Sequence, residues 1–184
     1  MNHALRAALV ALACLASSVA TLTTPAPEPP VSVFLLRHAE TEASTQTERD
    51  PALSDEGEAR ARALAKLLAK AGVTHLFSSE RERTRATLAP LAEATGIEVQ
   101  AVPAGDPGAQ VEKLRALAPG SVAVVAGHSN TIPGLVAALG GTMDDLVDLP
   151  RYGEAIYHES YDRLVLVTLA VGGASAAKTI ELRY

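Results

Sequence analysis

The chain has 184 residues, of which 48% are apolar and only 3% aromatic, and its formal net charge is −5. This length suits one domain whose core is built mainly from alanine, leucine and valine. An acidic chain without a long basic run is a poor ligand for polyanions, so the composition argues against nucleic acid as the main partner.

The first twenty residues have the pattern of a secretory signal peptide. A weakly basic start at residues 2–6 precedes an apolar run at residues 7–16, and small residues follow at positions 18 and 20. The run is too short for a comfortable membrane span. We therefore expect a signal peptide at residues 1–20 and export to the periplasm or the medium, with no transmembrane span after cleavage.

An uncleaved tail and a membrane anchor are the alternatives for this segment. Cys14, the only cysteine, loosely resembles a lipoprotein acylation site. If Cys14 is removed with the signal, no thiol chemistry and no disulfide remain in the exported chain.

A proline-rich linker at residues 21–30 precedes a segment in which strands alternate with helices, and we expect the folded domain to span residues 31–184. Hydrophobic periodicity and capping residues predict strands at residues 31–36, 73–78, 98–102, 121–126, 164–170 and 178–182. They predict helices at residues 55–71, at 80–95 with a kink at Pro90, at 108–117 and at 131–139. Near-continuous apolar strands between helices indicate an α/β fold, a three-layer α/β/α sandwich with a mainly parallel central sheet.

Two histidines follow two of these apolar strands. His38 comes after the strand at 31–36 and Arg37, and His128 comes after the strand at 121–126. Ligands of open α/β sheets gather at the carboxyl ends of strands, so both histidines are expected in one pocket. Arginine has a planar fork that matches phosphate oxygens, and a histidine nitrogen can attack phosphorus and carry the phosphoryl group covalently.

Two further polar clusters lie at strand ends. The first, SSERERTRAT at residues 78–87, opens a helix whose N-terminus favours anions. Its alternative interpretation is a solvated, salt-bridged helix start, which we expect for Arg81 and Arg85, while at least one arginine faces the pocket. The second, GHSNT at residues 127–131, suits an oxyanion or, alternatively, a turn capped by a polar side chain.

Four motifs, in this order along the chain, resemble those of the histidine phosphatase superfamily, the phosphoglycerate mutase-like proteins. They are LRHAET at residues 36–41, PALSDEG at 51–57, Ser-Ser with a later Arg and Thr at 78–87, and GHSN at 127–130. The resemblance implies the superfamily's α/β/α fold and a covalent phosphohistidine. It implies no metal and no organic cofactor, since arginines supply the charge that Mg²⁺ supplies in other phosphoryl-transfer enzymes.

The resemblance also implies roles for individual residues. His38 would be the phosphorylated nucleophile, and Arg37 and Arg83 would hold the phosphate oxygens. His128 would donate to the phosphoryl group as charge builds up in the transition state. Ser44 falls where mutases commonly have an asparagine, and it is retained here as a candidate phosphate ligand.

The general acid that protonates the leaving oxygen is expected at Asp106, on a loop between a short strand and a helix. The alternative is that Asp106 caps the helix beginning at Pro107. Glu98 and Glu112 are weaker candidates for the acid. A third possibility is that no acid is present, as in phosphohistidine-directed relatives, whose leaving group needs none.

These features predict an exported phosphatase that hydrolyses phosphomonoesters through a phosphohistidine, without a metal. The expected partner is a small-molecule or envelope-linked phosphomonoester, and the sequence leaves the natural substrate and the oligomeric state open. Two alternatives are a non-catalytic, phosphate-binding envelope protein of the same fold and a mutase-like phosphotransferase.

Overall fold

The computed structural model describes residues 28–169 and 177–184. The expected signal peptide, Cys14 and most of the proline-rich linker lie outside these residues. Within the described part of the chain, no helix is long and apolar enough to cross a membrane.

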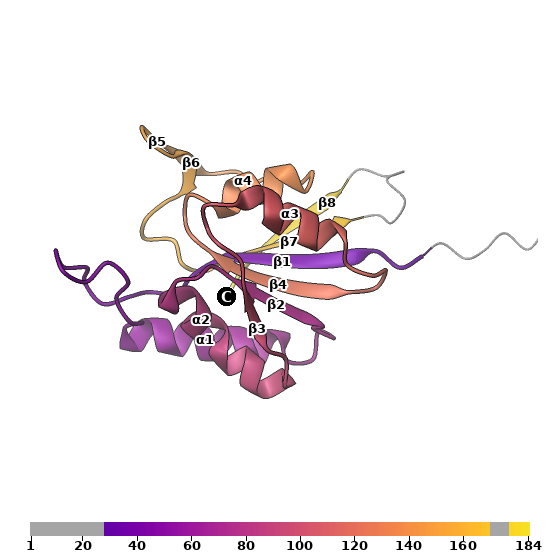
Figure 1. Cartoon of the computed structure of the whole chain (residues 1–184), viewed down its shortest axis with the longest axis horizontal. Helices are drawn as coiled ribbons and strands as arrows, with labels where there is room; N and C mark the ends of the chain where they lie inside the picture. The colour runs from indigo at the N-terminus through magenta and orange to yellow at the C-terminus, as the bar shows by residue number, and fades with distance from the viewer. Residues whose placement is uncertain (1–27, 170–176) are drawn as a thin grey trace, which may run out of the picture.

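Strands and helices alternate from Val31 onward (Figure 1). In chain order they are β1 (Val31–Arg37), α1 (Asp55–Leu68), β2 (His75–Ser78), α2 (Glu82–Thr95), β3 (Val99–Ala101), α3 (Pro107–Arg115), β4 (Val122–Gly127), α4 (Ile132–Ala138), β5 (Leu146–Leu149), β6 (Gly153–Ile156), β7 (Arg163–Leu169) and β8 (Lys178–Arg183).

The main sheet has the strand order β3-β2-β4-β1-β7-β8. The pairs β3–β2, β2–β4 and β4–β1 are parallel, whereas β7 is antiparallel to both β1 and β8. The predicted, mainly parallel sheet is therefore confirmed, with an antiparallel edge. Because β1 and β4 are parallel neighbours, the segments that follow them leave the sheet side by side.

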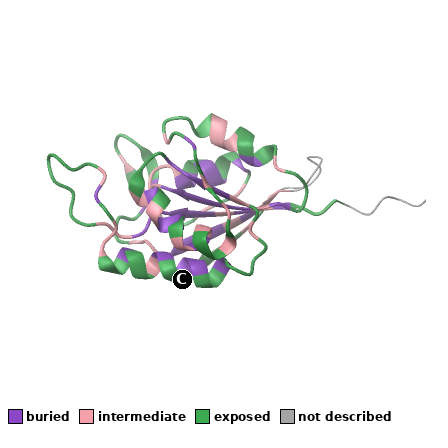
Figure 2. Ribbon diagram, turned by 60° about the horizontal axis from the view of Figure 1, so that its bottom comes forward, coloured by how far each residue is buried: buried purple, intermediate pink, exposed green. Residues whose placement is uncertain are grey.

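Helices cover both faces of the sheet (Figure 1). On one face, Leu64 of α1 and Leu88 of α2 pack with Leu36 and Val124 of the sheet in one apolar cluster. On the other face, α3 and α4 pack on a second cluster around β1, β4 and β7. Figure 2 shows the buried strands between more exposed helices. The expected three-layer α/β/α sandwich is confirmed.

The element boundaries differ from the predicted ones by a few residues. α1 begins after Ser54, whose side chain accepts a hydrogen bond from the Gly57 N–H at 3.2 Å, as expected of a cap, but the helix ends at Leu68. α2 begins at Glu82 and runs through Pro90 to Thr95. The β5–β6 hairpin was not predicted, because its short strands are mostly half-exposed or exposed and carry little hydrophobic periodicity.

The start of α1 fixes the segment that follows β1. A Cβ at Gly57 would overlap the backbone carbonyl of Glu40, so the close approach requires glycine there. Arg60 of α1 pairs with both carboxylate oxygens of Glu40, with its Nε 2.8 Å from each. These contacts hold the chain immediately after His38 against α1.

Candidate active site

The two histidines at the strand ends lie side by side. Their ring centroids are 5.5 Å apart with the planes at 68°, and the backbone N–H of His38 donates to the Gly127 carbonyl at 2.9 Å. This arrangement follows from the parallel β1–β4 register, which pairs Arg37 with Gly127. The expectation that His38 and His128 share one pocket agrees with this geometry.

The hydrogen bonds of His38 determine which ring nitrogen is free. Nδ1 lies 2.8 Å from the carbonyl oxygen of Ala39, and Nε2 lies 3.2 Å from Nε of Arg83. A guanidinium N–H only donates, so Nε2 accepts and Nδ1 carries the proton that reaches Ala39. Burial, with the charges of Arg37 and Arg83 adding to it, lowers the pKa of His38 to about 3. The side chain is therefore neutral near pH 7, with its Nε2 lone pair facing Arg83.

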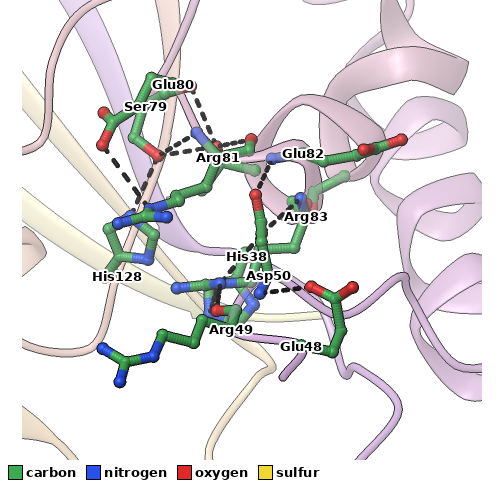
Figure 3. A network of polar contacts seen from close by, with 12 residues as sticks. His38, Glu48, Arg49, Asp50, Ser79, Glu80, Arg81, Glu82, Arg83 and His128 are labelled. Carbon is green, nitrogen blue, oxygen red and sulfur yellow. Dashed lines mark hydrogen bonds and ion pairs between the residues drawn. The ribbon is translucent and has the colours of Figure 1, made fainter. Parts of the chain in front are cut away.

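Arg83 is held in place by a residue that the sequence did not single out (Figure 3). Its Nη1 donates to Asp50 Oδ1 at 3.0 Å and to the Arg49 carbonyl at 3.2 Å. Asp50 also accepts the Glu82 N–H at 2.7 Å, and so caps α2, whose N-cap residue Arg81 makes no side-chain capping bond. Burial opposes ionisation of Asp50, but the N–H groups of Glu82 and Arg83 lower its pKa overall.

His128 has a network of its own. Its Nε2 lies 3.0 Å from Oγ of Ser79, which lies 2.9 Å from Oγ1 of Thr84. The backbone N–H of His128 donates to Oγ1 of Thr131 at 2.9 Å, which fixes the turn between β4 and α4. Burial, followed by the charge of Arg83, lowers the pKa of His128 to about 4. Both histidines are therefore neutral in the absence of a bound anion.

Arg37 points from the end of β1 toward the loop between β6 and β7. Its Nη1 donates to the carbonyls of His158 at 2.7 Å and Tyr157 at 3.3 Å, and its Nη2 donates to the Tyr161 hydroxyl at 3.0 Å. The guanidinium also stacks on the Tyr161 ring, 3.9 Å from its centroid. Its Nε is buried without a hydrogen-bond partner among the described residues. Nε is thus the one side-chain nitrogen of Arg37 that no other described residue engages.

A cavity of about 520 Å³ opens beside Arg83 and His128, the two neighbours of His38, whereas His38 and Arg37 themselves do not line it. Its lining includes Arg83, His128, Glu80, Tyr152 and the loop at residues 104–105. Glu80 accepts the Ala104 N–H at 2.8 Å, and that hydrogen bond lowers the pKa of its carboxyl. Glu80 is therefore ionised near neutral pH and is a poor proton donor.

The other two sequence candidates lie outside this group. Asp106 is exposed, accepts the Ala109 N–H at 2.9 Å as the cap of α3, and is not among the residues lining the cavity. This hydrogen bond is the one expected if Asp106 caps the helix that begins at Pro107. Ser44 lies in an exposed loop between β1 and α1, and neither of the two side chains is a hydrogen-bond partner of the His38 ring. Among the described residues, no group of three or more His, Cys, Asp or Glu side chains is arranged to hold a metal ion.

Asp50 and Tyr161 are the polar residues of the site that sequence reasoning missed. Both belong to irregular segments, and neither falls in a motif. Each is also remote in sequence from the arginine that it contacts. The only available signal was the presence of ionisable or aromatic residues in loops next to predicted strand ends.

Sequence comparison matches part of the chain to a family model. A model of the histidine phosphatase superfamily (branch 1) matches residues 33–104. A Serratia proteamaculans protein named "Probable phosphoglycerate mutase GpmB" is 41% identical over 73 residues, which is 38% of this chain and 34% of the relative. The match thus spans about a third of the length of that relative.

Two solved structures share the fold of this chain. The protein histidine phosphatase SixA bound to tungstate has a TM-score of 0.62 at 20% identity, covering 83% of this chain and 96% of SixA. A mycobacterial glucosyl-3-phosphoglycerate phosphatase has a TM-score of 0.56 at 20% identity, covering 83% of this chain and 97% of that enzyme.

Proposed function

Because the chain matches the histidine phosphatase superfamily in both sequence and fold, we propose that it is a phosphatase that transfers the phosphoryl group of a phosphomonoester to Nε2 of His38 and then to water. The observation that carries the proposal is the 3.2 Å contact between Arg83 Nε and His38 Nε2. It places a fixed cation, which matches phosphate oxygens, directly beside an unprotonated nitrogen nucleophile.

The proposed reaction has two steps. An incoming phosphate competes for the donors of Arg83, which frees the Nε2 lone pair to attack phosphorus. A P–N bond forms, the P–O bond to the leaving group breaks, and its electron pair stays on the leaving oxygen. Water then attacks the phosphohistidine, the P–N bond breaks, and inorganic phosphate and a proton are released.

Charge on the transferring phosphoryl group is balanced by this chain's own side chains. Arg83 and the partner-free Nε of Arg37 supply donors, and His128 supplies a third after it takes up a proton. Aimed donors in a site shielded from water stabilise developing negative charge strongly. These groups support a reaction that proceeds without a metal ion.

Neither the carboxylates of the site nor the sequence candidate Asp106 favours general-acid catalysis. Asp50 is paired with Arg83, Glu80 is held ionised, and Asp106 caps α3. This set supports substrates whose leaving group departs without a proton, such as aryl phosphates. Phosphohistidine, the target in the name of the "putative phosphohistidine phosphatase SixA" of Agrobacterium tumefaciens, has the same property.

The first test of this proposal is hydrolysis of para-nitrophenyl phosphate with EDTA present. The wild-type chain is expected to turn over, and His38→Ala is expected to be inactive. His75→Gln is the matched control, because His75 is the first residue of β2 and lies at the opposite end of the sheet from the carboxyl ends of the strands. Turnover by the His38→Ala protein would rule out the covalent route.

Mutase-type transfer is the second candidate, favoured by the 41% identity to the Serratia protein. In that case the phosphohistidine returns its phosphoryl group to a second hydroxyl. Incubation with a phosphoglycerate separates the two functions, because hydrolysis releases inorganic phosphate and transfer yields an isomer. Anion binding without either product would instead indicate a non-catalytic binding protein.

We also propose that the protein acts outside the cytoplasm, on the strength of the pattern in residues 1–20. Fractionation of cells that express the full chain, with sequencing of the N-terminus of the recovered protein, tests this. A cytoplasmic protein with an intact N-terminus would contradict it.

A further inference from the structure

A second hollow adjoins the phosphate pocket on the side of α3 and α4. Its volume is about 590 Å³, within the range of roughly 300–1,000 Å³ typical of small-molecule sites. Ala104, Asn130 and Thr131 line both this hollow and the phosphate pocket. The two spaces are therefore neighbouring parts of one depression, and a substrate whose phosphate contacts Arg83 and His128 has room to extend between the two helices.

The walls of this hollow are mainly apolar. Pro107 and Val111 of α3 face Leu135 of α4 across it, and Glu112 is the only charged residue among those lining it. Buried sugar hydroxyls or peptide groups would find few partners here, and an unpaired polar group is costly to bury. A hydrocarbon group has no hydrogen bonds to lose there, and removal of its surface from water is favourable.

Small residues keep the hollow open. A Cβ built at Gly134, on the exposed face of α4, meets no atom within 4 Å, and Gly108 of α3 lies on the wall as well. The two helices are also tied together, because Arg115 Nη2 of α3 donates to the Ala138 carbonyl of α4 at 2.8 Å. The space is thus bounded by helices that are held in position, rather than by a loose loop.

We infer that this hollow between α3 and α4 binds the hydrocarbon part of the leaving group, so that the substrate is a phosphomonoester of an apolar phenol. The inference rests on the proposed phosphatase function and adds the substrate class. The phosphate lies at His38 and Arg83, the ester oxygen faces Asn130 and Thr131, and the chain extends along α4. The chemical step is the one given above.

Binding of para-alkylphenyl phosphonates, which cannot be hydrolysed, tests the hollow independently of catalysis. Calorimetry compares phenylphosphonate with its para-ethyl and para-butyl homologues, whose headgroups are alike. Burial of one methylene contributes about 0.8 kcal/mol, so we expect affinity to rise about fourfold for each methylene that enters the hollow. Equal affinity across the series would overturn the inference, and tighter binding of a phosphohistidine peptide would assign the hollow to a polypeptide.

The variant Gly134→Leu tests the location. A leucine there projects into the hollow without a backbone clash, so the gain from phenyl to para-butylphenyl phosphonate is expected to fall at least fivefold. Ala63→Leu, on the exposed face of α1 and across the sheet, is the matched control and is expected to retain the gain. Loss of affinity to the same extent for both phosphonates in Gly134→Leu would overturn the inference.

Hydrolysis of the matching aryl phosphates distinguishes the two proposals. Because para-alkylphenols have similar acidity, chain length changes the occupancy of the hollow and not the reactivity of the ester. Phosphonate affinity that rises with alkyl length, without hydrolysis of any phosphate, would contradict the phosphatase function and support hydrocarbon binding in the hollow. Hydrolysis that does not depend on the length of the alkyl group would contradict hydrocarbon binding in the hollow and support the phosphatase function.

Discussion

Nε of Arg83 lies 3.2 Å from Nε2 of His38, in a contact where the guanidinium donates and the imidazole accepts. The opposite ring nitrogen of His38 is committed to the Ala39 carbonyl at 2.8 Å. One arginine therefore marks both the nucleophilic atom and the place where a phosphate oxygen would bind. The roles proposed for the rest of the site depend on this pair.

Replacing Arg83 with alanine removes a donor from the developing charge. Loss of one such donor typically slows turnover about 10²–10³-fold, and we expect a fall of that size in kcat/KM for para-nitrophenyl phosphate. Arg85→Ala, an exposed arginine on the same helix, is the control. If the two variants lose equal activity, Arg83 has no special place in the reaction.

Tyr161 is predicted to position Arg37. Tyr161→Phe keeps the stacked ring but loses the hydroxyl that accepts from Nη2 at 3.0 Å. A hydrogen bond to a charged group contributes about 1.5 kcal/mol, which corresponds to about tenfold in kcat/KM. Tyr161→Ala should lose more, with KM rising while the nucleophile stays intact. Wild-type kinetics in both variants would mean that the loop does not orient Arg37.

Asp106 is predicted to act as a helix cap and not as the general acid. Asp106→Ala should lower the free energy of unfolding by about 1 kcal/mol, whereas Asp106→Asn should keep the cap and the stability. Urea denaturation measures both. The rates on an alkyl and an aryl phosphate should change in the same proportion in each variant. A selective loss on the alkyl ester would restore Asp106 as the acid.

Anion binding is predicted to depend on pH through the histidines. Burial lowers the pKa of His38 to about 3 and that of His128 to about 4 in the anion-free protein. A bound dianion favours the protonated imidazole and raises these pKa values. Affinity should therefore strengthen as pH falls through the raised pKa and level off below the free pKa of about 4 for His128.

Sulfate is a suitable probe because it stays a dianion throughout this range. Calorimetry in buffers of different ionisation enthalpy counts the protons taken up on binding. Uptake in the wild-type protein between pH 5 and pH 7, and its reduction in His128→Gln, is the expected result. Binding without proton uptake would mean that neither histidine becomes protonated when the anion binds.

The sequence was most informative where local pattern and topology coincide. His38 and His128 follow strands whose apolar character is clear, and the parallel pairing of those strands brings the two residues together. The capping residue Ser54 and the helices on both faces were predictable for the same reason, because each is specified by nearby residues.

What the sequence could not predict depends on loops and long-range packing. Asp50 reaches Arg83 across 33 positions and Tyr161 reaches Arg37 across 124, so no local spacing links either pair. Asp106 was ambiguous because an aspartate before a proline at a helix start suits a cap and a catalytic acid equally. The structure favours the cap through its bond to Ala109.

The most direct test of the central claim is to trap the covalent intermediate. A single turnover of radiolabelled aryl phosphate is quenched in alkaline detergent, where phosphohistidine survives, and the labelled peptide is identified by mass spectrometry. We predict a base-stable, acid-labile phosphoryl group on His38, absent from the His38→Ala protein and formed in the presence of EDTA. Release of phosphate in a single turnover with no label on the protein, or with label on a different residue, would contradict the account.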